Sequence, residues 1–151
     1  MLKILEYQDE HQPWFESLNR KWIETHFWME SIDIEVLQNP VEHIISKGGS
    51  ILMAQYNNEI VGTVALKFVE PQVYEFTKMA VDEKSRGKKI GESLAKASIS
   101  KARTHGASKI VLYSNTVLQP AISLYRKLGF IEVPVDGPYK RSDIKMELSL
   151  I

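Results

Sequence analysis

The chain has 151 residues, of which 44% are hydrophobic and 25% are charged, as in an ordinary folded domain rather than a disordered segment. Its 19 basic and 19 acidic side chains give zero formal net charge, which disfavours a nucleic-acid binder or a binder of anionic membranes. The absence of cysteine excludes disulfides, thiolate catalysis and cysteine-based metal sites. We therefore expect one domain over residues 1–151.

The charges are unevenly distributed along the chain. Residues 1–75 hold 5 basic and 12 acidic side chains, whereas residues 76–151 hold 14 basic and 7 acidic ones. Such clustering is compatible with solvated surface alone, or with an anionic ligand on the basic half and a cationic one on the acidic half. The first residues lack the apolar run of a signal peptide, and no apolar run is long enough to span a membrane, so we expect a cytoplasmic protein.

Apolar periodicity and turn residues predict alternating helices and strands. In chain order the expected elements are a strand at 2–5, a helix from Pro13 to Phe27, a helix at 40–47 ended by Gly48, strands at 50–56, 60–69 and 73–81, a helix from Ile90 to Gly106, a strand at 109–113, a helix from Pro120 to Gly129, and closing strands at 130–133 and 143–150. The three central strands form an antiparallel meander, and one β-α-β crossover follows them. This order predicts an α+β fold.

The most informative segment joins the third meander strand to the long helix and runs from Arg86 to Gly91. Free backbone N–H groups and the helix dipole favour an anion at a helix N-terminus, and cations there are unfavourable unless an anion offsets them. The Gly-Lys-Ser/Thr ending of a Walker loop and the complete G-x-G-x-x-G pattern are both missing. The segment therefore predicts a pyrophosphate-type site, with a merely solvated basic turn as the alternative.

Two stretches resemble the GNAT superfamily of acyl-CoA N-acyltransferases. Residues 75–81 with Arg86–Gly91 are similar to its motif A, and residues 115–130, with Asn115 and Tyr125, are similar to its motif B. The resemblance implies a mixed, mostly antiparallel sheet with a central β-α-β crossover and helices on both faces. It also implies acetyl-CoA as co-substrate, no metal, and a primary amine of a small molecule or of a peptide as acceptor.

The resemblance further implies which residues bind the cofactor, with the pyrophosphate on the turn and the pantetheine arm along the preceding strand. These residues are Met79, Ala80, Val81, Arg86, Gly87, Lys88, Lys89, Ile90, Gly91, Asn115, Ala121, Tyr125 and Lys127. Lys89 occupies a position that is usually glycine in the family. We expect right-handed helical backbone there, so that the lysine adds charge without strain.

Three residues are the implied catalytic groups. Tyr125 would be the general acid, Glu75 the base, acting directly or through water, and Asn115 would bind the cofactor arm or a water molecule. The alternatives are a core tyrosine, a surface glutamate and a turn-forming asparagine. The reaction would be direct attack of the amine in a ternary complex.

The acceptor site is less defined. Trp28, Glu30 and Asp33 could form a pocket for a cationic amine. Tyr74, Tyr139 and Arg141 are weaker candidates, and an arginine would suit an amine that carries a carboxylate.

Three further expectations concern metals, partners and function class. The four histidines show no metal-ligand spacing, so we expect no metal site. The closing edge strand would allow a homodimer. The alternatives to an enzyme are a non-catalytic acyl-CoA sensor with the same fold and a phosphate- or nucleotide-binding protein unrelated to CoA.

Overall fold

A computed structural model describes residues 1–137 and 139–151. The elements in chain order are β1 (Leu2–Glu6), α1 (Gln12–His26), α2 (Ser31–Gln38), α3 (Pro40–His43), β2 (Ser50–Tyr56), β3 (Glu59–Glu70), β4 (Val73–Val81), α4 (Ile90–Thr104), β5 (Lys109–Ser114), α5 (Gln119–Lys127), β6 (Ile131–Val133) and β7 (Ile144–Ser149), with short 3-10 turns at Asp9–His11, Ile45–Lys47 and Glu83–Ser85. In the described part of the chain, seven strands form one sheet in the order β1-β2-β3-β4-β5-β7-β6. Strands β4 and β5 are parallel and the other neighbouring pairs are antiparallel. The predicted meander, crossover and closing strand pair are confirmed.

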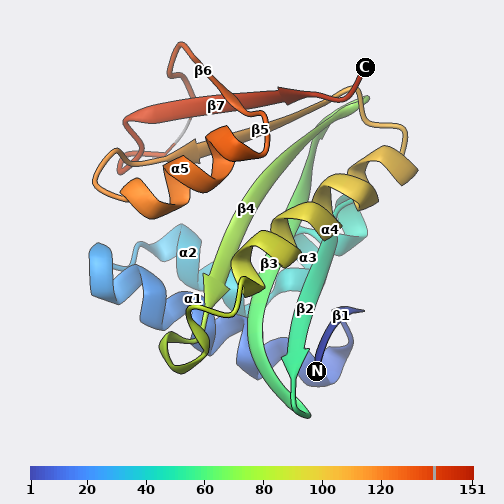
Figure 1. Ribbon diagram of the computed structural model, residues 1–151, viewed down its shortest axis with the longest axis vertical. Helices are drawn as coiled ribbons and strands as arrows, with labels where there is room; N and C mark the ends of the chain where they lie inside the picture. Colours follow the sequence, from blue (N-terminus) through green and yellow to red (C-terminus); the bar gives the residue numbers. More distant parts are fainter. Residues whose placement is uncertain (138) are drawn as a thin grey trace.

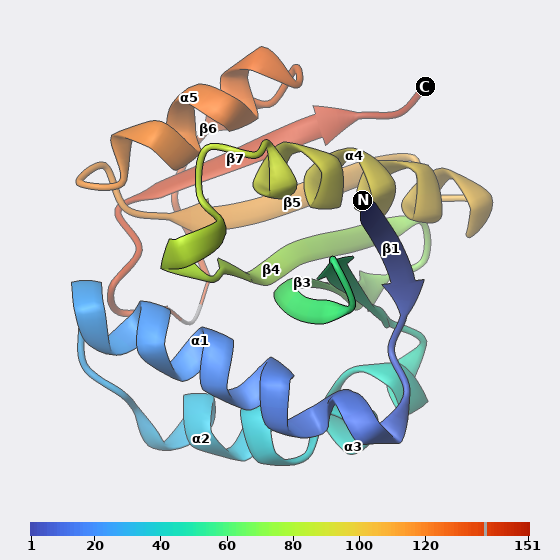
Figure 2. The same ribbon diagram turned by 60° about the horizontal axis from the view of Figure 1, so that its bottom comes forward.

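The helices cover both faces of the sheet, as expected (Figure 2). Helices α4 and α5 lie on one face, over a core that includes Leu94, Ile110 and Met146. Helices α1, α2 and α3 lie on the other face, over a second core around Phe15 and Leu37. Among the described residues, no helix combines the length and the apolar character needed to cross a membrane.

Two segments differ from the sequence prediction. Helix α2 was not expected, and it begins with a capping box in which the Asp33 side chain accepts from the Glu30 N–H at 2.9 Å. The helix expected at 40–47 breaks at Ile44, whose φ of −121° is not helical. The Ile44 side chain is buried in the core under α1, so its packing outweighs continuation of the helix.

The sheet splits between β4 and β5, which pair only through residues 73–75 and 109–111. Beyond Glu75 the two strands diverge, as Figure 1 shows. A β-bulge lies just past the split: Thr63 of β3 pairs with Ala80 and Ala65 pairs with Thr77, so that two residues of β4, Lys78 and Met79, oppose one residue of β3. The backbone groups that β4 and β5 leave unpaired border a gap with α1 on one side and α5 on the other.

Candidate active site

A pocket of about 120 Å³ opens where β4 and β5 separate. The side chains that line it are Glu75, Lys78 and Met79 from β4, Asn115 just after β5, Tyr125 from α5, Trp22 from α1 and Phe27 just after it, and Tyr139 and Arg141 from the loop before β7. The structure thus brings the three predicted catalytic residues to one cavity. Their chemical roles stay predictions.

Tyr125 lies on the α5 side of the pocket and is 8% exposed. Its ring packs edge-on against Phe76 and Phe130, with centroids 5.6 and 5.9 Å away. Among the described residues, the Tyr125 hydroxyl has no hydrogen-bond partner. Every fully buried side-chain polar atom of these residues does have a partner, so this hydroxyl is not fully buried. It opens on the pocket that Tyr125 lines. Burial raises the pKa of Tyr125, so the hydroxyl carries its proton at neutral pH.

Glu75 lies at the split itself and is 5% exposed. The Tyr139 hydroxyl donates to its Oε2 at 2.8 Å, and the ring of Tyr139 packs against Tyr113 with centroids 5.1 Å apart. Burial raises the pKa of Glu75, although the hydrogen bond from Tyr139 and the charges of Lys67, Lys78 and Lys145 act in the opposite direction. A carboxylate with a raised pKa that lines a pocket has the properties of a general base.

Four charged residues form an ion-pair cluster beside the pocket. Arg141 donates to both carboxylate oxygens of Asp33 at 2.8 Å and to Glu30 Oε2 at 3.1 Å. Lys78 Nζ lies 3.4 Å from Asp33 Oδ1. Burial alone would raise the pKa of Asp33, but these hydrogen bonds and the Glu30 N–H lower it from 3.8 to about 2. Glu30 and Asp33 are thus both paired with Arg141 within the protein, and a contact of either with a cationic amine stays a prediction.

Asn115 holds the loop before β7 in place. Its Nδ2 donates to the Arg141 carbonyl at 2.7 Å, and its Oδ1 accepts from the Val117 N–H at 3.0 Å. Both ends of the amide are thus engaged within the protein, and its predicted contact with the cofactor stays a prediction.

The turn before α4 differs from the prediction at one residue. Lys89, the N-cap of α4, has φ 59° and ψ 28°, so its backbone is left-handed and the expectation of helical geometry there is wrong. The chain needs this conformation to enter α4 from an extended Arg86, and glycine adopts it without the strain that a Cβ adds. Gly87 also has positive φ, of 83°.

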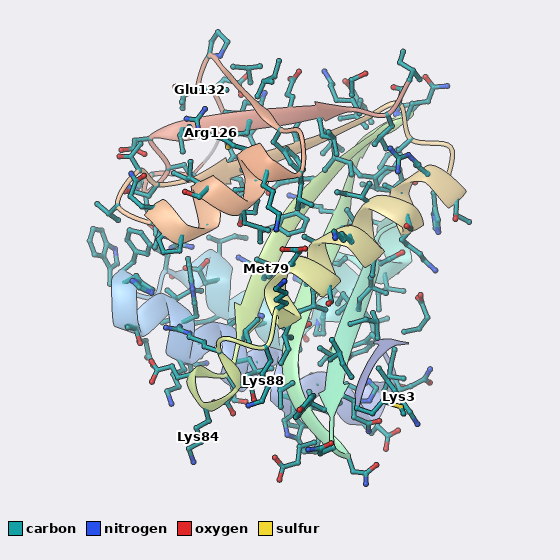
Figure 3. All side chains as sticks on the ribbon, in the orientation of Figure 1. Lys3, Met79, Lys84, Lys88, Arg126 and Glu132 are labelled. Carbon is teal, nitrogen blue, oxygen red and sulfur yellow. The ribbon has the colours of Figure 1, made fainter. Side chains whose placement is uncertain are left out.

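The first turn of α4 lies against the end of β4. Among residues 1–137 and 139–151 no side chain caps α4, so its first N–H groups are available to a ligand. A Cβ on Gly91 would lie 3.8 Å from Met79 Cε, which places this turn beside the split (Figure 3). In the same view Lys88 extends beside the start of α4, whereas Lys84 points away from the protein.

The remaining predicted residues are divided. Ala121 lines the pocket, and Lys127 is exposed and pairs with Glu92 at 2.8 Å. Trp28 is 68% exposed and Tyr74 packs in the core against Phe68 and His105, so the structure brings neither to the pocket.

Sequence reasoning missed Lys78 and Trp22, because a lysine in a strand and an aromatic on a helical stripe both suggest ordinary positions. One histidine, His43, gathers with Glu35 and Glu42 within 4.8 Å at the surface, where its Nε2 pairs with Glu35 at 3.1 Å. These three residues do not line the pocket.

Known protein structures share this fold. An acetyltransferase of the GNAT family from Staphylococcus aureus Mu50 superimposes with a TM-score of 0.91 at 21% identity, over 100% of both chains. The PaiA N-acetyltransferase of Thermoplasma acidophilum, solved in complex with coenzyme A, superimposes with a TM-score of 0.79 at 20% identity, over 99% of each chain.

Sequence relatives carry acetyltransferase names. Mycothiol acetyltransferase of Corynebacterium glutamicum is 32% identical over 84 residues, which are 56% of this chain and 29% of that protein. Human N-acetyltransferase 8B is 30% identical over 112 residues, which cover 68% of this chain and 49% of that protein, so the chain spans less than half of these relatives. The acetyltransferase (GNAT) family matches residues 6–130. The chain therefore belongs to the GNAT acetyltransferase family.

Proposed function

We propose that this protein is an N-acetyltransferase that moves an acetyl group from acetyl-CoA to a primary amine by direct attack in a ternary complex. The observation that carries the proposal is the pocket at the β4–β5 split, where a buried carboxylate and an open tyrosine hydroxyl line one cavity. Family membership and the acetyltransferase names of the relatives support the same activity.

The turn at 86–91 fits a pyrophosphate. The first N–H groups of α4 lack a side-chain cap, and a Cβ on Gly87 would meet nothing within 4 Å, so the space beside the turn is open. Arg86, Lys88 and Lys89 are exposed cations around it. Acetyl-CoA supplies the acetyl group as a thioester, and residues 79–81 of β4 would border its arm.

The residues of the pocket account for the proton transfers. The bound ammonium group first loses one proton to water, which frees the nitrogen lone pair. The nitrogen then forms a bond to the thioester carbon as the carbon–sulfur bond breaks; a second proton goes from the nitrogen to Glu75, and the leaving sulfur takes a proton from Tyr125. Exchange with water returns both side chains to their starting states. Main-chain N–H groups of β4 near Met79, unpaired on the β5 side, would stabilise the charge that develops on the carbonyl oxygen.

Thiol release from acetyl-CoA with a panel of polyamines, amino acids, aminoglycosides and short peptides tests the proposal. We expect Tyr125→Phe to lower kcat by about a hundredfold or more, because general acid catalysis contributes at least that much. Calorimetry should show a much smaller loss of affinity for CoA than the loss of kcat, since the phenyl ring keeps its packing. If no amine raises thiol release although CoA binds tightly, the protein is an acyl-CoA sensor. If ATP shifts the melting temperature as much as acetyl-CoA does, the site is a nucleotide site without specificity for CoA.

A further inference from the structure

Lys78 lies at the most unusual backbone position of the pocket wall. It has φ 55°, a left-handed conformation that costs a residue with a Cβ on the order of 1 kcal/mol, and it lies in the bulge of β4. In the regular strand that the sequence predicts, Glu75 and a residue three positions later point to opposite faces. The extra residue of the bulge reverses this alternation, so that Lys78 reaches Asp33 on the α2 side while Met79 faces α4. The bulge thereby places an ammonium group in the same pocket as Glu75.

The ammonium group of Lys78 is held weakly by the protein. Its side chain is 13% exposed, and among the described residues Asp33 is its sole ion-pair partner, at 3.4 Å. Asp33 is already satisfied without it, because Arg141 donates to both of its oxygens at 2.8 Å and the Glu30 N–H donates at 2.9 Å. An ammonium group has three donors, so at least two of those on Lys78 are left for a ligand in the pocket.

Glu75 and Lys78 thus present opposite charges to one cavity. The two groups lie close enough for each to shift the pKa of the other, and burial lowers the pKa of Lys78, which a bound anion would reverse. A zwitterion complements this pair, because its ammonium group matches Glu75 and its carboxylate matches Lys78 without changing the net charge of the pocket. Trp22 and Phe27 supply apolar surface for the rest of such a molecule.

We propose that the amine acceptor is a free amino acid whose ammonium group faces Glu75 and whose carboxylate binds Lys78. This inference rests on the proposed acetyltransferase function and adds the class of its substrate. Arg141 is a less suitable partner for the carboxylate, since it is already paired with two carboxylates, those of Asp33 and Glu30.

The test compares each free amino acid with its amide and with the amine left by decarboxylation, using thiol release from acetyl-CoA by the wild-type protein. The amide keeps the size and the amine but lacks the carboxylate charge. Its amine is also less basic, so more of it is in the nucleophilic form, which biases the assay against the proposal. We expect kcat/KM for at least one free amino acid to exceed that of its amide and its decarboxylated amine by about tenfold or more.

The variant Lys78→Met removes the charged end and keeps an unbranched side chain only one atom shorter, so we expect the bulge to persist. It should raise KM for the free amino acid by about tenfold, and it should abolish the preference over the amide. Lys67→Met is the matched control, because Lys67 pairs with Glu75 across the β3–β4 ladder and also acts on its pKa, but lies outside the pocket. It should keep the wild-type preference.

Each other outcome has a defined meaning. Equal acetylation of acids and amides, or a preference for peptides, overturns the inference and leaves the acetyltransferase function standing. If no amine is acetylated although CoA binds, the proposed function fails and the inference fails with it. The wild-type comparison decides between these outcomes even if Lys78→Met does not fold.

Discussion

The hydrogen bond from Tyr139 to Glu75 gives a direct test of the proposed base. The hydroxyl donates to Oε2 at 2.8 Å in a place where Glu75 is 5% exposed, so it stabilises the ionised carboxylate that a base requires. Tyr139→Phe removes this donor and keeps the ring that packs on Tyr113. The pKa of Glu75, which burial already raises, should therefore rise further.

The size of the effect follows from the hydrogen bond. A bond to a charged group contributes about 1.5–3 kcal/mol, and one pH unit corresponds to about 1.4 kcal/mol. Allowing for water that replaces part of the lost bond, the acidic limb of the kcat/KM profile should move to higher pH by about one unit. Activity above that limb should be retained, because Glu75 is still ionised there.

Tyr113→Phe is the matched control. Tyr113 belongs to the same ring pair, but its hydroxyl bonds to Asp136 at 3.2 Å instead of Glu75. We expect it to leave the acidic limb in place. If Tyr139→Phe does not move the limb, or Tyr113→Phe moves it equally, Glu75 is not the group whose ionisation controls the rate.

Three other substitutions test the backbone and the charge network. Lys89→Gly should be about 1 kcal/mol more stable in urea unfolding than Lys89→Ala. Both variants lose the same charge, and only glycine adopts φ 59° without strain. Equal stabilities of the two variants would refute the strain at this position. Asp33→Asn should lose about 3 kcal/mol of unfolding free energy at pH 7, since Arg141 and Lys78 lose the charge of their shared buried carboxylate and Arg141 keeps only its bond to Glu30. The pKa of Asp33 is about 2 in the folded protein and 3.8 without its partners, so its contribution to the free energy of unfolding is complete above pH 4 and is lost as the pH falls toward 2. The difference in stability between wild type and Asp33→Asn should therefore shrink over that pH range. Asn115→Ala should raise KM for the amine more than KM for acetyl-CoA, because it releases the Arg141 carbonyl, whereas the opposite result would indicate contact with the cofactor.

The fold was largely predictable because its signals are local. Residues of high β-propensity on both sides of a turn mark the meander strands, and apolar residues at helical spacing mark α1 and α4, so element type could be read from neighbouring residues. Helix α2 was not predicted because its N-cap is Glu30, which is not among the preferred capping residues, and because Ile32, Ile34 and Val36 are β-branched residues of modest helix propensity.

The turn at 86–91 could be singled out from its residues, and Tyr139 and Arg141 could be named as weaker candidates, but most positions of the site came from the family resemblance. The left-handed residues Lys78 and Lys89 could not be found, since lysine gives no indication of positive φ as glycine or asparagine would. The contacts of Tyr139 and Arg141 also join residues that are 64 and 108 positions apart, and local patterns carry no information about such pairs.

The split between β4 and β5 explains how two different substrates could meet in so small a domain. The pyrophosphate-type turn and Met79 lie on the α4 face of the sheet, whereas the ion-pair cluster lies on the α2 face. A continuous ladder would separate these faces, because paired backbone leaves no opening between strands. The pairing stops at Glu75, and the bulge three residues later directs Lys78 to one face and Met79 to the other. The proposed cofactor and acceptor can thus approach from opposite faces and meet only in the pocket, where Glu75 and Tyr125 flank the point of contact.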